Sequence, residues 1–290
     1  MDTSEEFLEC VERWAQIDVD GRINTAMNEF EEWINNFDDS EKDVLINLLK
    51  SFNYYTLNSI MNIIGQLSIK SKNKFDVTNG TSVVSVIRKK DGKLGSSSEY
   101  LILHRTVSEL SKNIYYDSLD DINEVEWGVI KNVVFVDDCS GTGKTFVNFL
   151  KRQRKPLSGK RIILIVIEIM EEAKKYIEKY SLQCGLDIEI IAHNIQKKAF
   201  IDTPESQKTL FDVLSRRQTV ENAYIRGFKN TEALMAFFNN TPNNTLGIFW
   251  YPTIKNKPIF LRELDEIPAW KKINNNKQKR TEQQYDAKRG

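Results

Sequence analysis

The chain has 290 residues, and its 41 Lys and Arg residues balance its 41 Asp and Glu residues at zero formal net charge. Hydrophobic residues make up 40% of it, and it has only 6 prolines and 13 glycines, which excludes collagen-like, linker-rich and disordered chains. The first residues lack the basic and apolar regions of a signal peptide, and no apolar run approaches the roughly 18 residues of a membrane span. We therefore expect a globular, cytoplasmic protein without membrane contact.

The cysteines and the charge distribution narrow this further. Cys10, Cys139 and Cys184 are odd in number and lack metal-ligand spacing, which argues against a disulfide framework. Residues 1–43 carry fourteen acidic and three basic side chains, whereas residues 271–290 carry seven basic and two acidic ones. We predict a basic, disordered tail over residues 266–290, open to a nucleic acid, a protein partner or the acidic segment of a second copy in a homo-oligomer.

The first part of the chain has helical periodicity. Apolar residues recur three or four positions apart in the segments 30–37, 45–52 and 60–67. The polar run over residues 68–80 then breaks this pattern. We therefore predict an N-terminal helical region over residues 1–74 and a domain boundary at its end.

Short β-branched, apolar runs alternate with helical segments in the following part, residues 75–265. The predicted strands are 81–87, 131–136, 161–170 and 186–192. The predicted helices begin at Ser96 and include residues 146–150, 171–184, 207–217 and 231–238, and a last strand is predicted at 245–250. This alternation is typical of an α/β fold with a mostly parallel sheet that binds ligands at the carboxyl ends of its strands.

The most informative segment is VVFVDDCSGTGKT, residues 133–145. Gly141 and Gly143 let the backbone turn sharply and approach a ligand, and the unpaired amides of the following helix attract an anion. Asp137 and Asp138 are unfavourable beside phosphate alone, but they suit sugar hydroxyls or a divalent cation that neutralises a second phosphate. The segment therefore predicts a phosphate site with a sugar or a cation beside it.

Gly143-Lys144-Thr145 also ends the P-loop pattern of nucleoside triphosphatases. The first glycine of that pattern falls on Asp138, whose charge would lie in the loop that must surround a polyphosphate. The next predicted strand offers only Glu168 where a magnesium-holding Asp is expected. An ATPase is therefore disfavoured.

Four apolar residues, two acids, three variable residues and Thr-Gly-x-Thr resemble the phosphoribosyl pyrophosphate (PRPP) loop of type I phosphoribosyltransferases. The resemblance implies that Asp137 and Asp138 are catalytic, hold the ribose hydroxyls and contact Mg²⁺ only through the ligand. It implies that the 5-phosphate is bound by the residues after the acids: Ser140, Gly141, Thr142, Gly143, Lys144 and Thr145. It also places a pyrophosphate loop at residues 89–98, with Lys90, Lys93 and Gly95 as ligands.

The phrase FVDDxxGTGK, the Trp33–Phe37 element and the segment 239–250 are similar to phosphoribosyltransferase-like proteins of bacterial conflict systems, over residues 28–262. Members occur in antiphage defence loci, some beside retron reverse transcriptases. The resemblance implies a defence effector that transfers or hydrolyses a phosphoribosyl group at C1 with Mg²⁺, together with a protein or nucleic-acid partner. The alternative is a non-catalytic module that senses a phosphoribosyl ligand or nucleotide and gates such a partner.

Two departures from the resemblance bear on the acceptor. Gly141 stands where purine phosphoribosyltransferases often have an Asp that acts on the base, and the predicted pyrophosphate loop is rich in Lys and Ser. Purine salvage is therefore disfavoured, and the sensing alternative gains weight. The remaining candidates have structural as well as functional interpretations: His193 as a base, Cys139 as a nucleophile, Asn243 and Asn244 as ligand-binding or turn residues, and Trp250 as a core or stacking residue.

Overall fold

The computed structural model describes residues 3–15, 29–88, 96–260 and 262. The predicted basic tail lies outside the described residues. Within them, no helix combines the length and the apolar character needed to cross a membrane.

The core of the fold is a parallel sheet, which confirms the predicted α/β class. Its described strands are, in order across the sheet, β3 (Tyr115–Tyr116), β2 (Ser82–Ser85), β4 (Asn132–Ser140), β5 (Arg161–Met170) and β6 (Asp187–Gln196). The interior strand β5 is buried from Ile162 to Met170, as expected for an apolar strand covered on both faces. The bounds of β5 are those that the sequence predicts.

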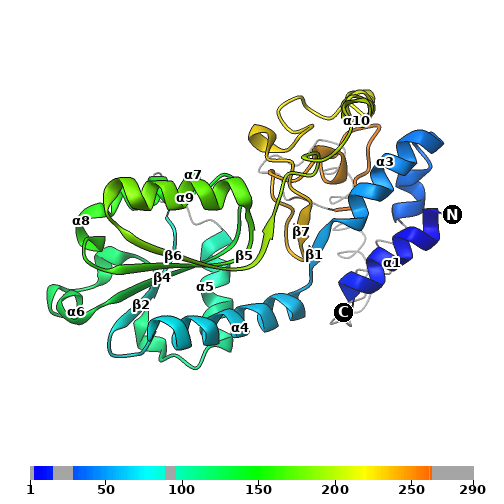
Figure 1. The fold of residues 1–290 in the computed structure, drawn as a ribbon. Coiled ribbons are helices and arrows are strands. Elements are labelled where there is room, and N and C mark those ends of the chain that lie inside the picture. The colour runs from blue at the N-terminus through cyan, green and yellow to red at the C-terminus, as the bar shows by residue number, and fades with distance from the viewer. Residues whose placement is uncertain (1–2, 16–28, 89–95, 261, 263–290) are drawn as a thin grey trace, which may run out of the picture.

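Helices cover both faces of this sheet (Figure 1). One face carries α4 (Leu57–Phe75) and α5 (Ser96–Val107), and the other carries α7 (Lys144–Arg152) and α9 (Glu171–Cys184). Shorter helical elements connect the strands: η1 (Lys112–Ile114), η2 (Leu119–Asp121), α6 (Glu124–Val129) and α8 (Arg154–Leu157). The prediction of helix 171–184 is confirmed.

Helix α4 corrects the predicted break at residue 68. The helix starts after Thr56, whose Oγ1 accepts a hydrogen bond from the Ser59 N–H at 3.2 Å, and it continues to Phe75. Ser68, Ser71 and Phe75 lie on its buried face, and the lysines between them lie on the exposed face, so this part of the polar run continues an amphipathic helix. The predicted boundary after residue 74 therefore falls at the end of α4.

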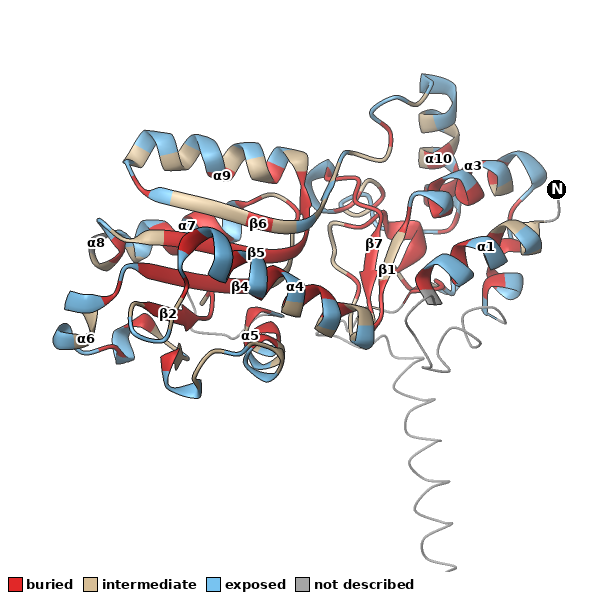
Figure 2. Ribbon diagram, turned by 60° about the horizontal axis from the view of Figure 1, so that its bottom comes forward, coloured by how far each residue is buried: buried red, intermediate tan, exposed pale blue. Residues whose placement is uncertain are grey.

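A second apolar cluster lies beside the sheet, at the carboxyl ends of its strands (Figure 2). We call the part that contains it the hood: residues 3–15, 29–55, 197–260 and 262. It includes α1 (Thr3–Ala15), α3 (Asp39–Lys50), α10 (Glu205–Arg217) and the turns η3 (Phe228–Asn230) and η4 (Gly247–Phe249). Aromatic contacts hold it together; for example, the ring centroids of Phe52 and Phe260 lie 4.4 Å apart.

The hood also contains a short parallel pair of strands, β1 (Asn53–Tyr55) and β7 (Met235–Phe237). The predicted helix 231–238 is wrong, because Glu232 has a left-handed φ of 52° and residues 235–237 pair with β1. The predicted strand 245–250 is also wrong. Thr245 forms only an isolated bridge to Ala233, and the chain then turns through η4.

Candidate functional site

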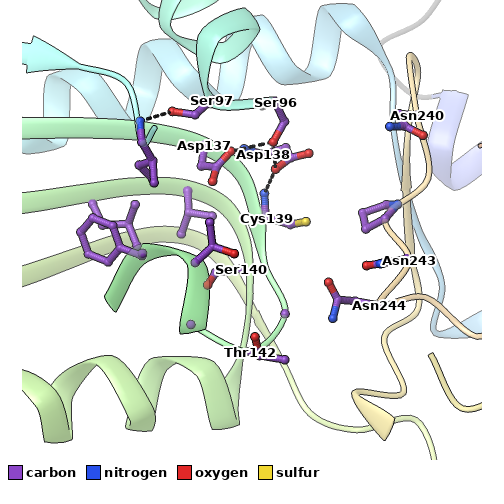
Figure 3. Close-up of a pocket in the computed structure, with 18 of the residues that line it drawn as sticks. Ser96, Ser97, Asp137, Asp138, Cys139, Ser140, Thr142, Asn240, Asn243 and Asn244 are labelled. Atoms are coloured by element: carbon purple, nitrogen blue, oxygen red, sulfur yellow. Dashed lines mark hydrogen bonds between the residues drawn. The ribbon is translucent and has the colours of Figure 1, made fainter. Parts of the chain in front are cut away.

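A cavity of about 270 Å³ lies between the carboxyl end of β4 and the hood. Its lining comes from both parts of the chain and includes Ile87, Ser96, Ser97, residues 137–143, Thr145, Phe146, Leu164, Val166, Asn240, residues 242–244 and Arg262. Figure 3 shows the acids and the glycine loop on one side and the asparagines of the hood on the other. The structure therefore brings most of the predicted site residues to one pocket.

The two acids form the polar end of strand β4. The Ser96 hydroxyl lies 2.9 Å from Oδ1 of both Asp137 and Asp138. It has one proton, so it donates to one carboxylate at a time. The Asp138 N–H donates to Asp137 Oδ1 at 3.1 Å, and the Cys139 N–H donates to Asp138 Oδ1 at 2.6 Å. Burial and the neighbouring Asp138 carboxylate raise the pKa of Asp137 well above its usual value.

The loop after the acids turns sharply into α7. Gly143 precedes the helix with a φ of 70°, and a Cβ there would lie 2.9 Å from the Ala173 carbonyl oxygen, so only glycine fits. Thr142 and Thr145 line the cavity, and Thr142 Oγ1 accepts a hydrogen bond from the Lys144 N–H at 3.4 Å. The loop thus presents hydroxyls and the start of a helix to the cavity.

Three predicted ligands and Lys144 are not part of the described pocket. Lys90, Lys93 and Gly95 lie outside the described residues. Lys144 does not line the cavity; its ammonium faces Lys229 of the hood and lowers the pKa of that residue.

Several lining residues were not identified from the sequence as site residues. Ser96 lies in the predicted pyrophosphate loop 89–98 but was not named as a ligand there, and its hydroxyl bonds the acids. Ser97 Oγ donates to the Val136 carbonyl at 2.9 Å and accepts from the Ile87 N–H at 3.0 Å. The available signal was topological, since the helix after one parallel strand begins at the same edge as the acids that end its neighbour. No such signal pointed to Arg262, whose Nη1 donates to the Thr241 carbonyl at 2.6 Å.

A buried carboxyl group lies behind the loop. Glu168 of β5 is fully buried, next to Cys139 in the sheet register, and burial raises its pKa to about 7. Burial and the nearby Asp138 carboxylate also raise the pKa of Cys139 well above that of a free thiol, which disfavours a thiolate nucleophile. Glu168 does not line the cavity, so it acts on the site only through its neighbours.

For the remaining candidate residues, the position in the fold decides between the structural and the functional interpretation. His193 lies within β6, not at its end, and does not line the cavity; burial lowers its pKa. Trp250 is a core residue whose Nε1 donates to the Thr245 carbonyl at 2.8 Å. Asn243 and Asn244 both shape the hood turn and line the cavity.

Mg²⁺ is held by oxygen ligands, which in proteins usually include one or two carboxylates. Among the described residues, no three His, Cys, Asp or Glu side chains are grouped as metal ligands. Within the described lining, Asp137 and Asp138 are the residues that offer carboxylate oxygens to the cavity. This pair fits Mg²⁺ that is held mainly by a ligand's oxygens and by water, as is usual for phosphate-bound Mg²⁺.

Comparison with known proteins identifies a family. The model of the PRTase-CE family matches residues 30–262. No curated protein is a significant match. A solved structure of a hypothetical protein from Neisseria gonorrhoeae with bound ppGpp is 17% identical, with a TM-score of 0.33, over 55% of this chain and 96% of that chain. Helicobacter pylori xanthine-guanine-hypoxanthine phosphoribosyltransferase is 14% identical, with a TM-score of 0.32, over 54% of this chain and 95% of that chain.

Proposed function

The chain belongs to the PRTase-CE family, and we propose that its pocket binds a phosphoribosyl donor of the PRPP type with Mg²⁺ and transfers or hydrolyses the phosphoribosyl group at C1. The observation that carries the proposal is the continuity of the polar wall. Two acids, a glycine turn and the start of α7 follow one another along one side of a single cavity. A ribose 5-phosphate has the same order of groups, a diol and then a phosphate.

The 5-phosphate belongs at the loop. The first backbone amides of α7 have no partner within the helix, and the helix dipole favours an anion there. The hydroxyls of Thr142 and Thr145 add donors from the same wall. Gly143 keeps the backbone close enough for these groups to act together.

The ribose diol belongs at the acids. Among the described residues, Asp137 and Asp138 share a single hydroxyl donor, Ser96, so the pair has acceptor capacity for a ligand. Two sugar hydroxyls would supply the missing donors and offset the cost of two adjacent carboxylates. The pair therefore recognises a diol better than it would a second phosphate.

Asp137 and Asp138 would hold Mg²⁺ through the donor's oxygens, and the ion would stabilise the negative charge of the departing pyrophosphate. The chain's own residues fix the phosphate and the sugar, so that C1 lies between the acids and the hood. Positive charge that develops on the sugar ring faces the two carboxylates. Such a reaction needs little proton transfer, which suits a cavity whose described lining contains no histidine.

The proposal extends to bacterial antiphage defence, where the protein would be an effector with a protein or nucleic-acid partner. This part rests on the motif resemblance over residues 28–262. The second candidate function is a sensing module without catalysis, which is favoured by the absence of a side chain at Gly141.

Incubation with PRPP and Mg²⁺ separates the two functions. Release of pyrophosphate above the protein-free rate supports the transferase or hydrolase. Binding of PRPP without pyrophosphate release excludes hydrolysis and is the result expected of the sensing module. Absence of PRPP binding contradicts the transferase or hydrolase and leaves the sensing module only a nucleotide ligand.

A further inference from the structure

A side chain of the hood fills the space beside Gly141. A Cβ at position 141 would lie 2.2 Å from Cγ of Asn244, and 2.4 and 2.5 Å from its Nδ2 and Oδ1. Gly141 does not have a left-handed φ, so its backbone alone does not require glycine. Position 141 therefore lacks a side chain because the Asn244 carboxamide occupies its place.

The orientation of this carboxamide is set by contacts within the hood. Asn244 Nδ2 lies 3.1 Å from Thr231 Oγ1, and Thr231 is buried. The backbone is held as well, because a Cβ at Gly227 would lie 2.0 Å from the Asn244 carbonyl oxygen. Asn244 Oδ1 has no hydrogen-bond partner among the described residues, and Figure 3 shows the side chain extending from the hood toward the glycine loop.

A second carbonyl oxygen of the same wall is also unpaired. Asn240 Oδ1 is buried and has no hydrogen-bond partner among the described residues, although Asn240 lines the cavity. A buried polar atom without a partner costs free energy that a ligand with a donor group can recover. The hood wall is thus supplied with hydrogen-bond acceptors.

We propose that Asn244 makes water the acceptor of the reaction, by holding a water molecule against C1 of the donor. The inference rests on the proposed function. If the donor's phosphate and diol occupy the loop and the acids, the nucleophile approaches from the opposite wall. That wall presents Asn240, Asn244 and their neighbours.

With water, the carbonyl oxygen of Asn244 accepts one O–H and directs the oxygen lone pair at C1. The C1–O bond to pyrophosphate breaks, and its electron pair leaves with pyrophosphate. The new C1–O bond forms to the water oxygen, which gives ribose 5-phosphate. A carboxamide is not a base at neutral pH, so the released proton passes to solvent or to pyrophosphate.

The contact itself is tested by melting temperature. Gly141→Ala should lower Tm by about 4 °C or more, because the new methyl group has no space. Adding Asn244→Ala should restore most of that loss. Gly65→Ala is the matched control, since a Cβ at Gly65 meets nothing within 4 Å. Gly141→Ala with an unchanged Tm would overturn the inference.

The role of Asn244 in the reaction is tested with PRPP and Mg²⁺. Calorimetry measures PRPP binding, and the release of ribose 5-phosphate measures turnover. Asn244→Ala should reduce kcat at least about tenfold and leave the Kd for PRPP within about twofold. Asn148→Ala on the exposed side of α7 is the control and should match the wild type.

The outcomes separate the two proposals. A wild type that does not bind PRPP overturns the proposed function, and this inference with it. A wild type that binds PRPP but does not hydrolyse it, or an Asn244→Ala variant that hydrolyses it at the wild-type rate, overturns the inference alone.

Discussion

Asn53 Nδ2 donates to both carboxylate oxygens of Glu168, at 3.1 and 3.3 Å, and so ties the first strand of the hood to strand β5 of the parallel sheet. Asn194 of β6 adds a third contact at 3.2 Å. Asn53 and Glu168 are far apart in the chain, and both lie behind the candidate pocket. Because these partners are neutral, they do not compensate fully for the burial of a negative charge, and the pKa of Glu168 stays raised.

Glu168 should make the protein less stable as the pH rises. Its pKa is about 7 in the folded chain against 4.5 for the ordinary carboxyl group, so the folded state binds this proton more tightly than the unfolded state. Its contribution is therefore fully present below pH 4.5 and is lost as the pH rises to about 7, by roughly 3 kcal/mol in total.

Urea unfolding of the wild type and of Glu168→Gln at pH 5 and pH 8 measures this difference. Between pH 5 and pH 8, the unfolding free energy should fall much less in Glu168→Gln than in the wild type. In Glu124→Gln, at an exposed position of α6, it should fall as much as in the wild type. An equal decrease in Glu168→Gln and the wild type would show that this carboxyl group does not titrate as described.

Replacing Asp137 and Asp138 together by Asn should abolish PRPP binding and leave the fold intact. The acids end a strand at the pocket, and removing adjacent charges relieves the repulsion that raises the pKa of Asp137. The increase in Tm caused by PRPP and Mg²⁺ should disappear, while the ligand-free Tm stays equal or rises. Asp120→Asn with Asp121→Asn, a pair of exposed neighbouring acids, is the control. A ligand-free Tm that falls as far as that of a core deletion would make the acids structural.

Thr145 and Lys144 should differ in their effect on binding. Thr145 lines the cavity and Lys144 does not, so Thr145→Val should weaken PRPP binding by about tenfold and Lys144→Ala by much less. Titration calorimetry of both variants gives the comparison. ATP hydrolysis that Lys144→Ala eliminates would instead support a nucleoside triphosphatase.

Asn256 should be a main determinant of hood stability. It is buried, accepts a hydrogen bond from Trp33 Nε1 at 3.0 Å, and donates to the carbonyls of Ile248 and Tyr251 at 3.1 and 2.9 Å. Asn256→Ala would leave two buried groups and the partly buried Tyr251 carbonyl unpaired, at a cost of about 3 kcal/mol or more in unfolding free energy. Thermal or urea unfolding measures this loss, and Asn113→Ala at an exposed position serves as the control. A loss below about 1 kcal/mol would contradict the described network.

The sheet could be predicted from the sequence because its determinants are local. The apolar run 161–170 followed by Glu171 and Glu172 defines a buried strand and a helix start without reference to the rest of the chain. The same holds for the acids and glycines of the pocket, which are contiguous. Two parts of the sequence analysis stay predictions: the ligands Lys90, Lys93 and Gly95, and the domain limits.

The hood could not be predicted in this way because its structure depends on distant partners. Strand β7 forms by pairing with β1, near the other end of the chain. Lys229, Asn230 and Glu232 have left-handed φ values although none of them is a glycine, so a search for glycines does not locate this turn. Asn244 likewise reaches Gly141 only through the tertiary fold.

The central claim is that this pocket binds a phosphoribosyl donor. Titration calorimetry of the wild-type chain with PRPP in the presence of Mg²⁺, and separately with ATP and Mg²⁺, tests it most directly. We expect one PRPP molecule to bind per chain, and we expect no ATP binding at the same concentrations. Absence of heat with PRPP, or ATP bound as tightly as PRPP, would contradict it.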